Sequence, residues 1–354
     1  AYCQLSNKAQ WGCNAMPISF TTFVSHLAQD PVLAVTTALV LAVILVNGWT
    51  DAPNAIATAV VTDALPFRPA VVLAAICNLL GVVCMTAVNS SVAETIYDIA
   101  DFSGDPSSAL TALCAALVSI VAWAVLAWRF GIPTSESHAL VAGVTGAAIA
   151  LRGGLSNVRA AAWGKVLLGL VLSVALGFLL GRLAVRLLPR RGSSRAFRKC
   201  QIGGAAAMAF LHGAQDGQKF MGVFLLGTAL AAGRRDTETF LIPLWLMVLC
   251  ALVMALGTAM GGRRIIDTVG RDMVSLTPRL GFAADLGGGV CLLLCTALGL
   301  PVSTTHAKTA AILGVGGRAD RGVVRSILLT WIFTFPGCGL IGFFTAKCFL
   351  SLFS

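Results

Sequence analysis

Charged side chains are scarce in this sequence. Asp, Glu, Lys and Arg make up 11% of the 354 residues, whereas hydrophobic residues make up 57%. Because soluble domains carry about a quarter charged residues, the chain lacks the polar surface that soluble domains of this length require. The same counts exclude a disordered, collagen-like or coiled-coil protein. Long apolar runs with almost no charge instead predict an all-α polytopic membrane protein.

Acidic residues are the scarcer of the two charge types. The 15 Asp and Glu are outnumbered by 25 Lys and Arg, which gives a net charge of +10. In a membrane protein such an excess marks cytoplasmic loops, so the expected partner is the lipid bilayer and not nucleic acid. Most of the 11 cysteines lie in apolar runs, where Cys behaves as a small hydrophobe. Cys3 and Cys13 lie in a polar segment and would form a disulfide if that end faces an oxidising compartment.

Apolar segments of about the length of one membrane span, or longer, follow one another along the chain. Two of them are too long for one straight helix, and each has a polar, glycine-containing patch in its middle, at 47–51 and 212–216. These patches predict broken helices. The ten segments lie at 31–63, 69–88, 108–129, 133–151, 166–188, 200–232, 240–261, 281–299, 301–316 and 326–352.

Corresponding features recur in the two parts of the chain. Residues 131–138 align with residues 299–306 without a gap, at an offset of 168. Each stretch has a proline followed by a hydroxyl run, and the short segments that they begin are predicted to be re-entrant-type hairpins. Asp51 lies 82 residues before the first of these prolines, and Asp216 lies 85 residues before the second. Two halves with broken segments in corresponding places indicate a transporter site.

The basic residues predict how the two halves cross the membrane. If the ten segments cross alternately and the acidic loop after the second segment lies outside, the inside stretches hold 16 Lys and Arg and the outside stretches hold 6. This orientation satisfies the positive-inside bias, although three basic residues between the fourth and fifth segments oppose it. It places the N-terminal segment 1–30 outside and the basic linker 189–199 in the cytoplasm. Five crossings per half would make the halves, 31–188 and 200–354, inverted repeats.

Each polar patch contains a carboxylate, Asp51 or Asp216, in the middle of an apolar segment. A charge there is costly in a membrane. A single Asp could simply face a neighbouring helix, but two at matching places, with amide and hydroxyl neighbours, favour a site for a monovalent cation or a proton. Asp51 and Asp216 are therefore candidate Na⁺ ligands. The candidate coupling-ion residues in the two patches are Asp51, Thr50, Asp216 and Gln215.

The hydroxyl runs lie where two helices are expected to begin. Backbone N–H groups and Ser or Thr hydroxyls at a helix N-terminus bind anions. A single run of this kind more often caps a helix, but two inverted copies favour an anion held between two helix N-termini. The candidate substrate-binding residues are Thr134, Ser135, Ser137, Ser303, Thr304 and Thr305, together with Asn54 and Gln218 from the polar patches.

At these motifs the chain resembles the inorganic phosphate transporter (PiT) family of secondary carriers. The family pattern G-x-N-D-x-x-N-x-x-x-T is matched at Gly48, Asp51, Asn54 and Thr58. Its second copy is matched from Gly213 to Gly222, and the element P-x-S-[ST]-[ST]-H is matched fully at 301–306 and partly at 133–138. The paired motifs are specific, and the resemblance covers nearly the whole chain.

The resemblance implies a secondary active symporter for inorganic phosphate, coupled to Na⁺ or H⁺, in the cell (plasma) membrane. It implies no enzymatic activity and no cofactor besides the coupling ion. A homodimer is expected from the resemblance alone.

Three residues depart from the family pattern. Thr50 and Gln215 stand where the family has Asn, and Glu136 stands where a hydroxyl residue is usual. We expect Glu136 to titrate as part of the coupling site: protonated, it would donate a hydrogen bond to the anion, and ionised, it would repel it. The alternative is that Glu136 turns away to pair with Lys219 or Arg129. The departures leave open coupling by H⁺, an altered number of cations, or a substrate other than simple phosphate.

Other functions fit parts of the pattern. Sulfate or another tetrahedral oxyanion would suit the same cradle, and a channel would need a continuous polar path. An intramembrane hydrolase is a remote alternative, because a serine nucleophile needs a histidine and a carboxylate, and the Ser-x-x-His spacing occurs twice where one active site needs it once. Lys219 is expected either to pair with an acidic residue or to snorkel outward. His138 and His306 are expected to fix the hairpin tips by hydrogen bonds, or else to relay protons.

Overall fold

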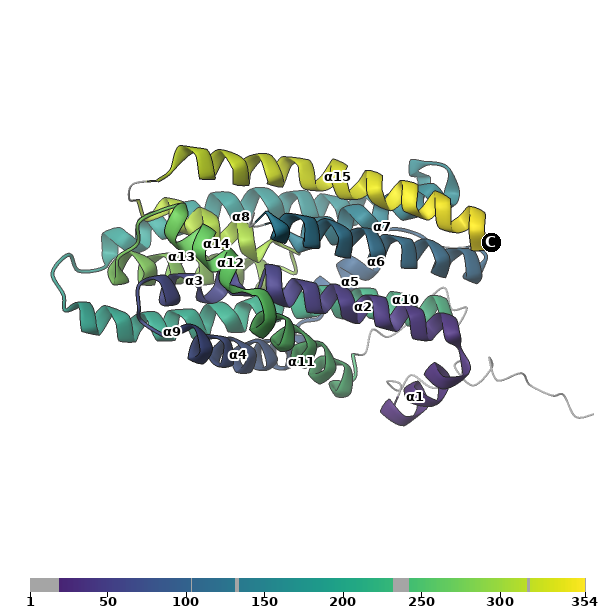
Figure 1. The fold of residues 1–354 in the computed structure, drawn as a ribbon, viewed down its shortest axis with the longest axis horizontal. Helices are drawn as coiled ribbons and strands as arrows, with labels where there is room; N and C mark the ends of the chain where they lie inside the picture. The colour runs from purple at the N-terminus through teal and green to yellow at the C-terminus, as the bar shows by residue number, and fades with distance from the viewer. Residues whose placement is uncertain (1–18, 103, 131–133, 232–241, 317–318, 354) are drawn as a thin grey trace, which may run out of the picture.

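The computed structural model describes residues 19–102, 104–130, 134–231, 242–316 and 319–353. The described residues form an elongated bundle of helices, with α15 along one edge and α4 and α11 along the opposite edge (Figure 1). Within these ranges there is no β-strand, only two isolated bridges. The all-α prediction is therefore confirmed. Cys3, Cys13 and Pro133 lie outside the described residues, so the predicted disulfide stays a prediction.

All ten predicted segments are helical. In the first half they are α2 (Pro31–Thr50) with α3 (Pro53–Val61), α4 (Phe67–Val88), α6 (Pro106–Arg129), α7 (Glu136–Arg152) and α8 (Ala160–Leu187). In the second half they are α9 (Ser194–His212) with the π-helix η3 (Gly213–Gly217) and α10 (Gln218–Ala231), then α11 (Leu244–Gly261), α13 (Pro278–Ala297), α14 (Thr304–Gly314) and α15 (Arg321–Phe353). The sequence did not predict the short helices α1 (Phe20–Gln29), α5 (Ser91–Tyr97), η2 (Leu155–Asn157), α12 (Arg263–Asp267) and η4 (Thr268–Asp272).

The first polar patch ends one helix and begins another. Pro53 has no N–H, and in a continuous helix its ring would clash with the carbonyl group four residues earlier. The chain therefore turns at Asp51 and Ala52, whose N–H groups both bond to the carbonyl oxygen of Asn47. Gly48 lies inside α2 and not at the break. It lets α2 approach α11, because a Cβ there would lie 2.2 Å from the carbonyl oxygen of Met254.

The second polar patch differs from the first. Residues Gly213–Gly217 form a π-helix that joins α9 to α10 without an interruption. Such one-residue insertions in α-helices are frequent at functional sites. Gly213 again serves close packing, because a Cβ there would lie 2.2 Å from the carbonyl oxygen of Asn78 on α4. The two copies of the motif thus differ in local structure: the first is a break between two helices, and the second is a π-helix within a continuous one.

The hairpin segments are short. α14 has 11 residues, which span about 16 Å at 1.5 Å per residue, so α14 alone cannot cross a hydrocarbon core of about 30 Å. Gly299 makes the turn between α13 and α14 with φ of 64°, a left-handed conformation that suits glycine.

By length and composition, six helices among the described residues could cross a membrane, or seven if the bent pair α11 and α12–η4 counts as one span. The ten alternating crossings stay a prediction.

Helices of one half pack mainly on helices of the other. α7 packs on α15, and α14 packs on α8; α2 packs on α11, and α9 packs on α4. Within the halves, α2 contacts α6 as α9 contacts α13, and α6 contacts α7 as α13 contacts α14. Each of these contacts thus has a counterpart when the two halves are exchanged. This pattern supports two related halves, while their inverted orientation stays a prediction.

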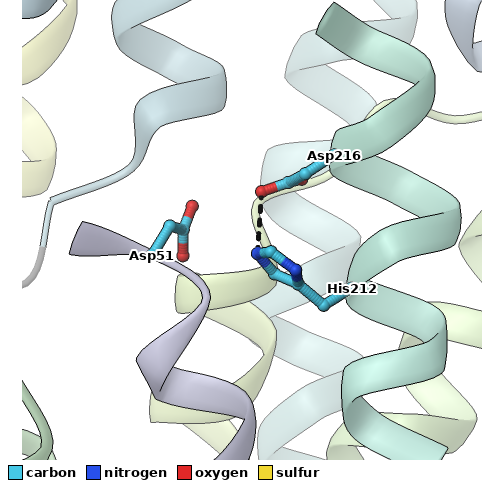
Figure 2. Close-up of side chains that lie close together, drawn as sticks. All are labelled: Asp51, His212 and Asp216. Carbon is cyan, nitrogen blue, oxygen red and sulfur yellow. Dashed lines mark ion pairs between the residues drawn. The ribbon is translucent and has the colours of Figure 1, made fainter. Parts of the chain in front are cut away.

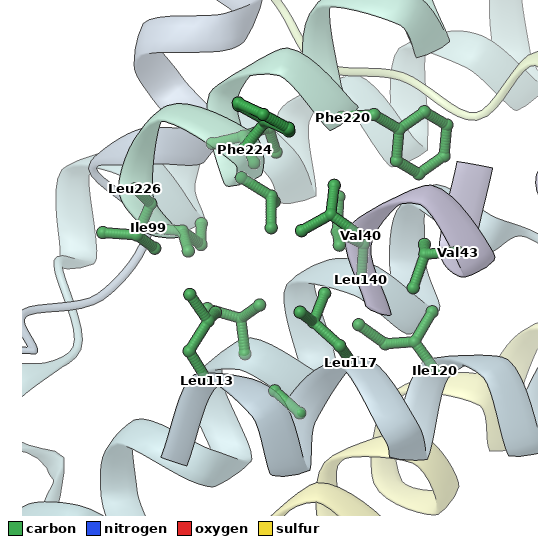
Figure 3. Packing of buried hydrophobic residues seen from close by; sticks show 14 of the residues in the cluster. Val40, Val43, Ile99, Leu113, Leu117, Ile120, Leu140, Phe220, Phe224 and Leu226 are labelled. Carbon is green, nitrogen blue, oxygen red and sulfur yellow. The ribbon is translucent and has the colours of Figure 1, made fainter. Parts of the chain in front are cut away.

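A cluster of buried hydrophobic residues packs α2, α6 and α7 of the first half against α10 and α11 of the second (Figure 3). Its members include Leu113, Leu117 and Ile120 on α6, Leu140 on α7 and Phe220 on α10, all fully or almost fully buried. The cluster lies on one side of the two polar patches at 47–51 and 212–216.

Candidate functional site

Asp51 is fully buried at the break between α2 and α3. Its Oδ1 accepts hydrogen bonds from the hydroxyls of Thr305 and, at 3.2 Å, Thr304 at the start of α14. The amide of Asn54, one turn along α3, donates to the same oxygen at 3.2 Å and to Thr305 at 2.9 Å. Asp51 Oδ2 has no hydrogen-bond partner among the described residues. One carboxylate oxygen is thus saturated by donors and the other is free for a cation or a proton.

Asp216 lies opposite Asp51, in the π-helix η3 (Figure 2). Its Oδ1 accepts from the ammonium of Lys219 at 2.5 Å. Its Oδ2 accepts from Asn47 of α2 at 3.3 Å and lies 3.3 Å from Nε2 of His212. One ligand atom from each of Asp51, His212 and Asp216 lies within 4.8 Å of the others, close enough to share one cation. His212 was not predicted from the sequence, although its i,i+4 spacing from Asp216 indicates a shared helix face.

Lys219 joins Asp216 to both hairpin tips. Besides Asp216, its ammonium donates to the hydroxyl of Ser137 at 2.6 Å and to the carbonyl oxygen of Val302. The side chain is fully buried. Of the two expectations for Lys219, the charge partner is therefore confirmed and outward snorkelling is wrong. A cation fixed between the two tips also supplies positive charge where the sequence predicts an anion.

The hydroxyls at the two tips have different partners. Ser135 caps α7 by accepting from the N–H of His138 at 3.3 Å, and Ser303 caps α14 by accepting from the N–H of His306 at 3.2 Å. Capping uses a lone pair of each oxygen and leaves its proton free to donate. Thr304 also approaches Asp216 Oδ2 at 3.5 Å, so it lies between the two carboxylates. The two N-termini and the two Asp residues therefore meet in one place.

Glu136 begins α7 and is fully buried. Its Oε1 accepts from the hydroxyl of Thr50 at 3.2 Å, and its Oε2 has no partner among the described residues. Lys219 is occupied by Asp216 and Ser137, so it does not pair with Glu136. Thr50 thus lies against the extra carboxyl group, next to Asp51.

Three predicted site residues bond elsewhere. Gln215 donates to Thr296 at 2.9 Å and to the carbonyl oxygen of Leu300 at 3.2 Å, which ties η3 to the α13–α14 turn. Gln218 donates to the carbonyl oxygen of Asn89 at 2.9 Å. The hydroxyl of Thr134 accepts from Trp123 Nε1 at 3.2 Å and lies 3.3 Å from the hydroxyl of Thr334, toward α6 and α15. Sequence spacing placed these residues near the motif but could not show which way they turn.

His138 and His306 lie side by side just inside the two tips. Their ring centroids are 4.6 Å apart, and His306 stacks on Trp331 at 3.8 Å. None of the four ring nitrogens has a hydrogen-bond partner among the described residues. Contact between the rings brings the tips together, whereas the hydrogen bonds expected from the sequence are not seen.

A second buried ion pair lies on the other flank of Asp51, and the sequence analysis missed it. Lys308 on α14 pairs with Asp285 on α13, and the hydroxyl of Thr58 on α3 donates to Asp285 at 2.6 Å. Lys308 is fully buried, and Asp285 is 2% exposed. A lone Asp in the apolar segment 281–299 was the available signal, but no Asp stands at the corresponding place in the first half.

Comparison with known proteins gives a consistent family. Residues 47–342 match the phosphate transporter family. A Bacillus subtilis (strain 168) protein named "Probable low-affinity inorganic phosphate transporter" is 35% identical over 329 residues, which are 89% of this chain and 97% of that protein. A protein of the same name from Mycobacterium tuberculosis (strain H37Rv) is 36% identical over 88% of this chain and 76% of its own.

A solved structure has a similar fold. It is named "The sodium-dependent phosphate transporter", and it superposes with a TM-score of 0.81 over 92% of this chain and 100% of that chain, at 23% sequence identity. The named relatives are transporters and not enzymes.

Proposed function

The chain belongs to the phosphate transporter family, and from this premise we propose that it is a secondary active symporter that carries inorganic phosphate with Na⁺ or H⁺ across the cell membrane. The observation that carries the proposal is that Lys219 joins both hairpin tips to Asp216. This buried ammonium contacts both hairpin tips and Asp216, and Asp51 lies opposite. An anion cradle and a cation site thus lie side by side, which is the arrangement a symporter needs.

In the proposed cradle, phosphate lies between the N-termini of α7 and α14. The free hydroxyl protons of Ser135 and Ser303 and the backbone N–H groups of both first turns would donate to it, since helix N-termini favour anions. Ser137, Thr304 and Thr305 would exchange their present partners for phosphate oxygens. Asn54 would hold Thr305 in place. Thr134 and Gln218, which bond elsewhere, fall outside the proposed cradle.

In the proposed coupling site, Asp51 and Asp216 share the cation. Asp51 Oδ2 offers an open carboxylate oxygen, and the hydroxyls of Thr304 and Thr305 are adjacent. Oxygen ligands of this kind suit Na⁺, and the name of the similar solved structure supports Na⁺ as the first candidate. His212 at 3.3 Å from Asp216 and the unpaired Oε2 of Glu136 support a role for H⁺. Thr50 would act through Glu136, and Gln215 by holding the turn before α14.

We further propose the membrane arrangement that the sequence predicts. Residues 31–188 and 200–354 are inverted repeats, the linker 189–199 is cytoplasmic, and the N-terminal segment 1–30 is outside. The matching contacts of the two halves support their relation as repeats, and the distribution of Lys and Arg supports the orientation. Alternating access then follows from movement of one set of helices against the other around the fixed site. A homodimer is proposed from family resemblance only.

The test is transport by the purified full chain in proteoliposomes. Labelled phosphate and labelled sulfate are supplied outside, and a Na⁺ gradient and a pH gradient are imposed separately. We expect phosphate to accumulate above its equilibrium level with one of the two gradients, and sulfate to accumulate much less. Equilibration without accumulation would indicate a channel, and accumulation of sulfate in preference to phosphate would replace the substrate.

A further inference from the structure

One face of α3 carries polar side chains beyond the coupling site. Asn54 and Thr58 lie in α3, Asp51 lies at the break before it, and Thr62 caps its end. Their spacings of three, four and four residues place them along one side of this segment. All four are buried. Asp51 belongs to the proposed coupling site and Asn54 to the proposed cradle, and Thr58 and Thr62 continue the polar face to the end of α3.

The outer part of this face meets a buried polar cluster. Thr58 donates to Asp285 Oδ1 at 2.6 Å, and Lys308 donates to the same oxygen and, at 3.2 Å, to Thr58. One turn further, Thr62 donates to Gln201 on α9 at 2.7 Å. Buried polar groups therefore form a series from Asp51 past Asp285 to Gln201. Gln201 lies about two turns into α9, the helix that follows the basic linker.

For Thr58, Asp285 and Lys308, the corresponding position in the opposite half is apolar. With the offset of 168 that aligns the hairpins, Asp285 corresponds to Leu117, and Lys308 corresponds to Leu140. With the offset of 165 between Asp51 and Asp216, Thr58 corresponds to Val223. These three residues are buried in the hydrophobic cluster, where Figure 3 shows Leu117 and Leu140. The fold therefore accepts hydrocarbon at these places and does not need an ion pair.

One carboxylate oxygen of this cluster is unpaired within the described part of the chain. Asp285 Oδ2 is buried without a partner among the described residues, although Asp285 Oδ1 has two donors. Asp285 Oδ2 faces α9, since a Cβ on Gly204 would lie 3.1 Å from it. Charged residues inside a membrane bundle are costly and commonly mark ion pathways. An unpaired carboxylate oxygen between the coupling site and the end of α3 is suited to receive a cation.

We propose that Asp285, Thr58 and Lys308 form a second cation station, through which the coupling cation passes between the Asp51 site and the end of α3 at Thr62 and Gln201. The proposal rests on the symport function proposed above. The Lys308 ammonium neutralises Asp285 when no cation is there. A cation that enters makes the station positive overall, so it binds only transiently and moves on. Without the ammonium, the cation would be held.

The test compares two reactions of the full chain in proteoliposomes. The first is net uptake of labelled phosphate under a Na⁺ gradient and, separately, under a pH gradient. The second is phosphate–phosphate exchange with equal Na⁺ and pH on both sides, which needs no net cation release. The test variant is Asp285→Leu with Lys308→Leu, which copies the first half. We expect the ratio of net uptake to exchange to fall by about tenfold or more, because loss of the station slows cation release, which exchange does not need.

Two further variants sharpen the test. Lys308→Met should bind labelled Na⁺ more tightly than wild type, if Na⁺ drives uptake, and should also lower the ratio. Leu140→Met, at the position that corresponds to Lys308, is the matched control and should leave the ratio within about twofold. If the double variant does not elute as a folded protein in size-exclusion chromatography, the isosteric Asp285→Asn is tested by the same two reactions.

The outcomes separate the two proposals. A wild-type ratio in a folded double variant would show that the pair only packs, and an equal loss of both reactions would place the defect in the substrate site; either result overturns the station. Absence of gradient-driven uptake by the wild-type chain would instead overturn the symport function itself.

Discussion

Asp285, Lys308 and Thr58 each have an apolar counterpart at the corresponding position of the opposite half, namely Leu117, Leu140 and Val223. Both sets are buried and lie between corresponding helices. One flank of the Asp51–Asp216 pair is therefore hydrocarbon, and the other contains an ion pair and hydroxyls. Related helices keep the same packing while their side chains differ in charge. The fold therefore accepts either apolar or polar and charged side chains at these positions.

A substitution in the polar centre around Asp216 should lower the free energy of unfolding more than one in the hydrophobic cluster. Asp216→Asn would leave the ammonium of Lys219 buried without its charge partner, and breaking a buried pair costs about 3–5 kcal/mol. Thermal unfolding in detergent measures the loss. The double variant with Lys219→Met should recover much of it, because no unpaired charge remains. A single variant as stable as wild type would show that this pair contributes nothing to folding.

The apolar flank should respond to volume instead of charge. Leu140→Ala in the hydrophobic cluster should lower the free energy of unfolding by about 2–5 kcal/mol, because the cavity cannot collapse fully. Leu140→Met keeps the volume and should cost less than about 1.5 kcal/mol. Equal losses for the two variants would mean that this cluster is loosely packed, and the contrast between the flanks would then disappear.

The hydroxyls of the tips should affect affinity more than stability. Ser303→Ala removes a proposed donor to phosphate, and a hydrogen bond to a charged group is worth about 1.5–3 kcal/mol, so apparent phosphate affinity should fall about tenfold or more. Thr134→Val is the control, because that hydroxyl bonds toward Trp123 and Thr334. Unchanged affinity in Ala variants of Ser135, Ser303 and Thr304 would contradict the cradle.

Glu136 should produce the smallest effect, seen as a change in pH dependence. It faces Thr50, with Asp51, Asp216 and Lys219 as the charged groups of the same centre. The ionised form repels phosphate and the protonated form can donate to it, so apparent affinity should fall as pH rises. Glu136→Gln mimics the protonated form and should keep its affinity at high pH. Identical pH profiles for the two proteins would leave Glu136 a structural role only.

The sequence predicted the features that occur in both halves. The ten helical segments, Asp51, Asp216 and the two hydroxyl tips were found because each has a counterpart, and a repeated costly residue is hard to explain by chance. The structure confirms the helices and brings these residues together. The resemblance to phosphate carriers, carried by the same motifs, is confirmed by the family match over residues 47–342.

Features of one half alone were missed. Asp285 and Lys308 have apolar counterparts, so no repeat drew attention to them, and their contact joins residues 23 positions apart. His212 approaches Asp216 in the π-helix, whose local geometry the composition does not reveal. Thr134 and Gln218 lie beside the correct motifs but bond away from the centre. Which way a side chain turns depends on tertiary packing, and spacing along the chain does not show it.

The most direct test of the coupling site is Asp51→Asn in proteoliposomes, measured as gradient-driven accumulation and as phosphate–phosphate exchange. Asn keeps the shape of the side chain and removes the charge that the cation requires. We expect the variant to lose accumulation while it still exchanges phosphate, with normal expression and folding. Accumulation equal to that of the wild type would show that Asp51 is structural and that the coupling cation binds elsewhere.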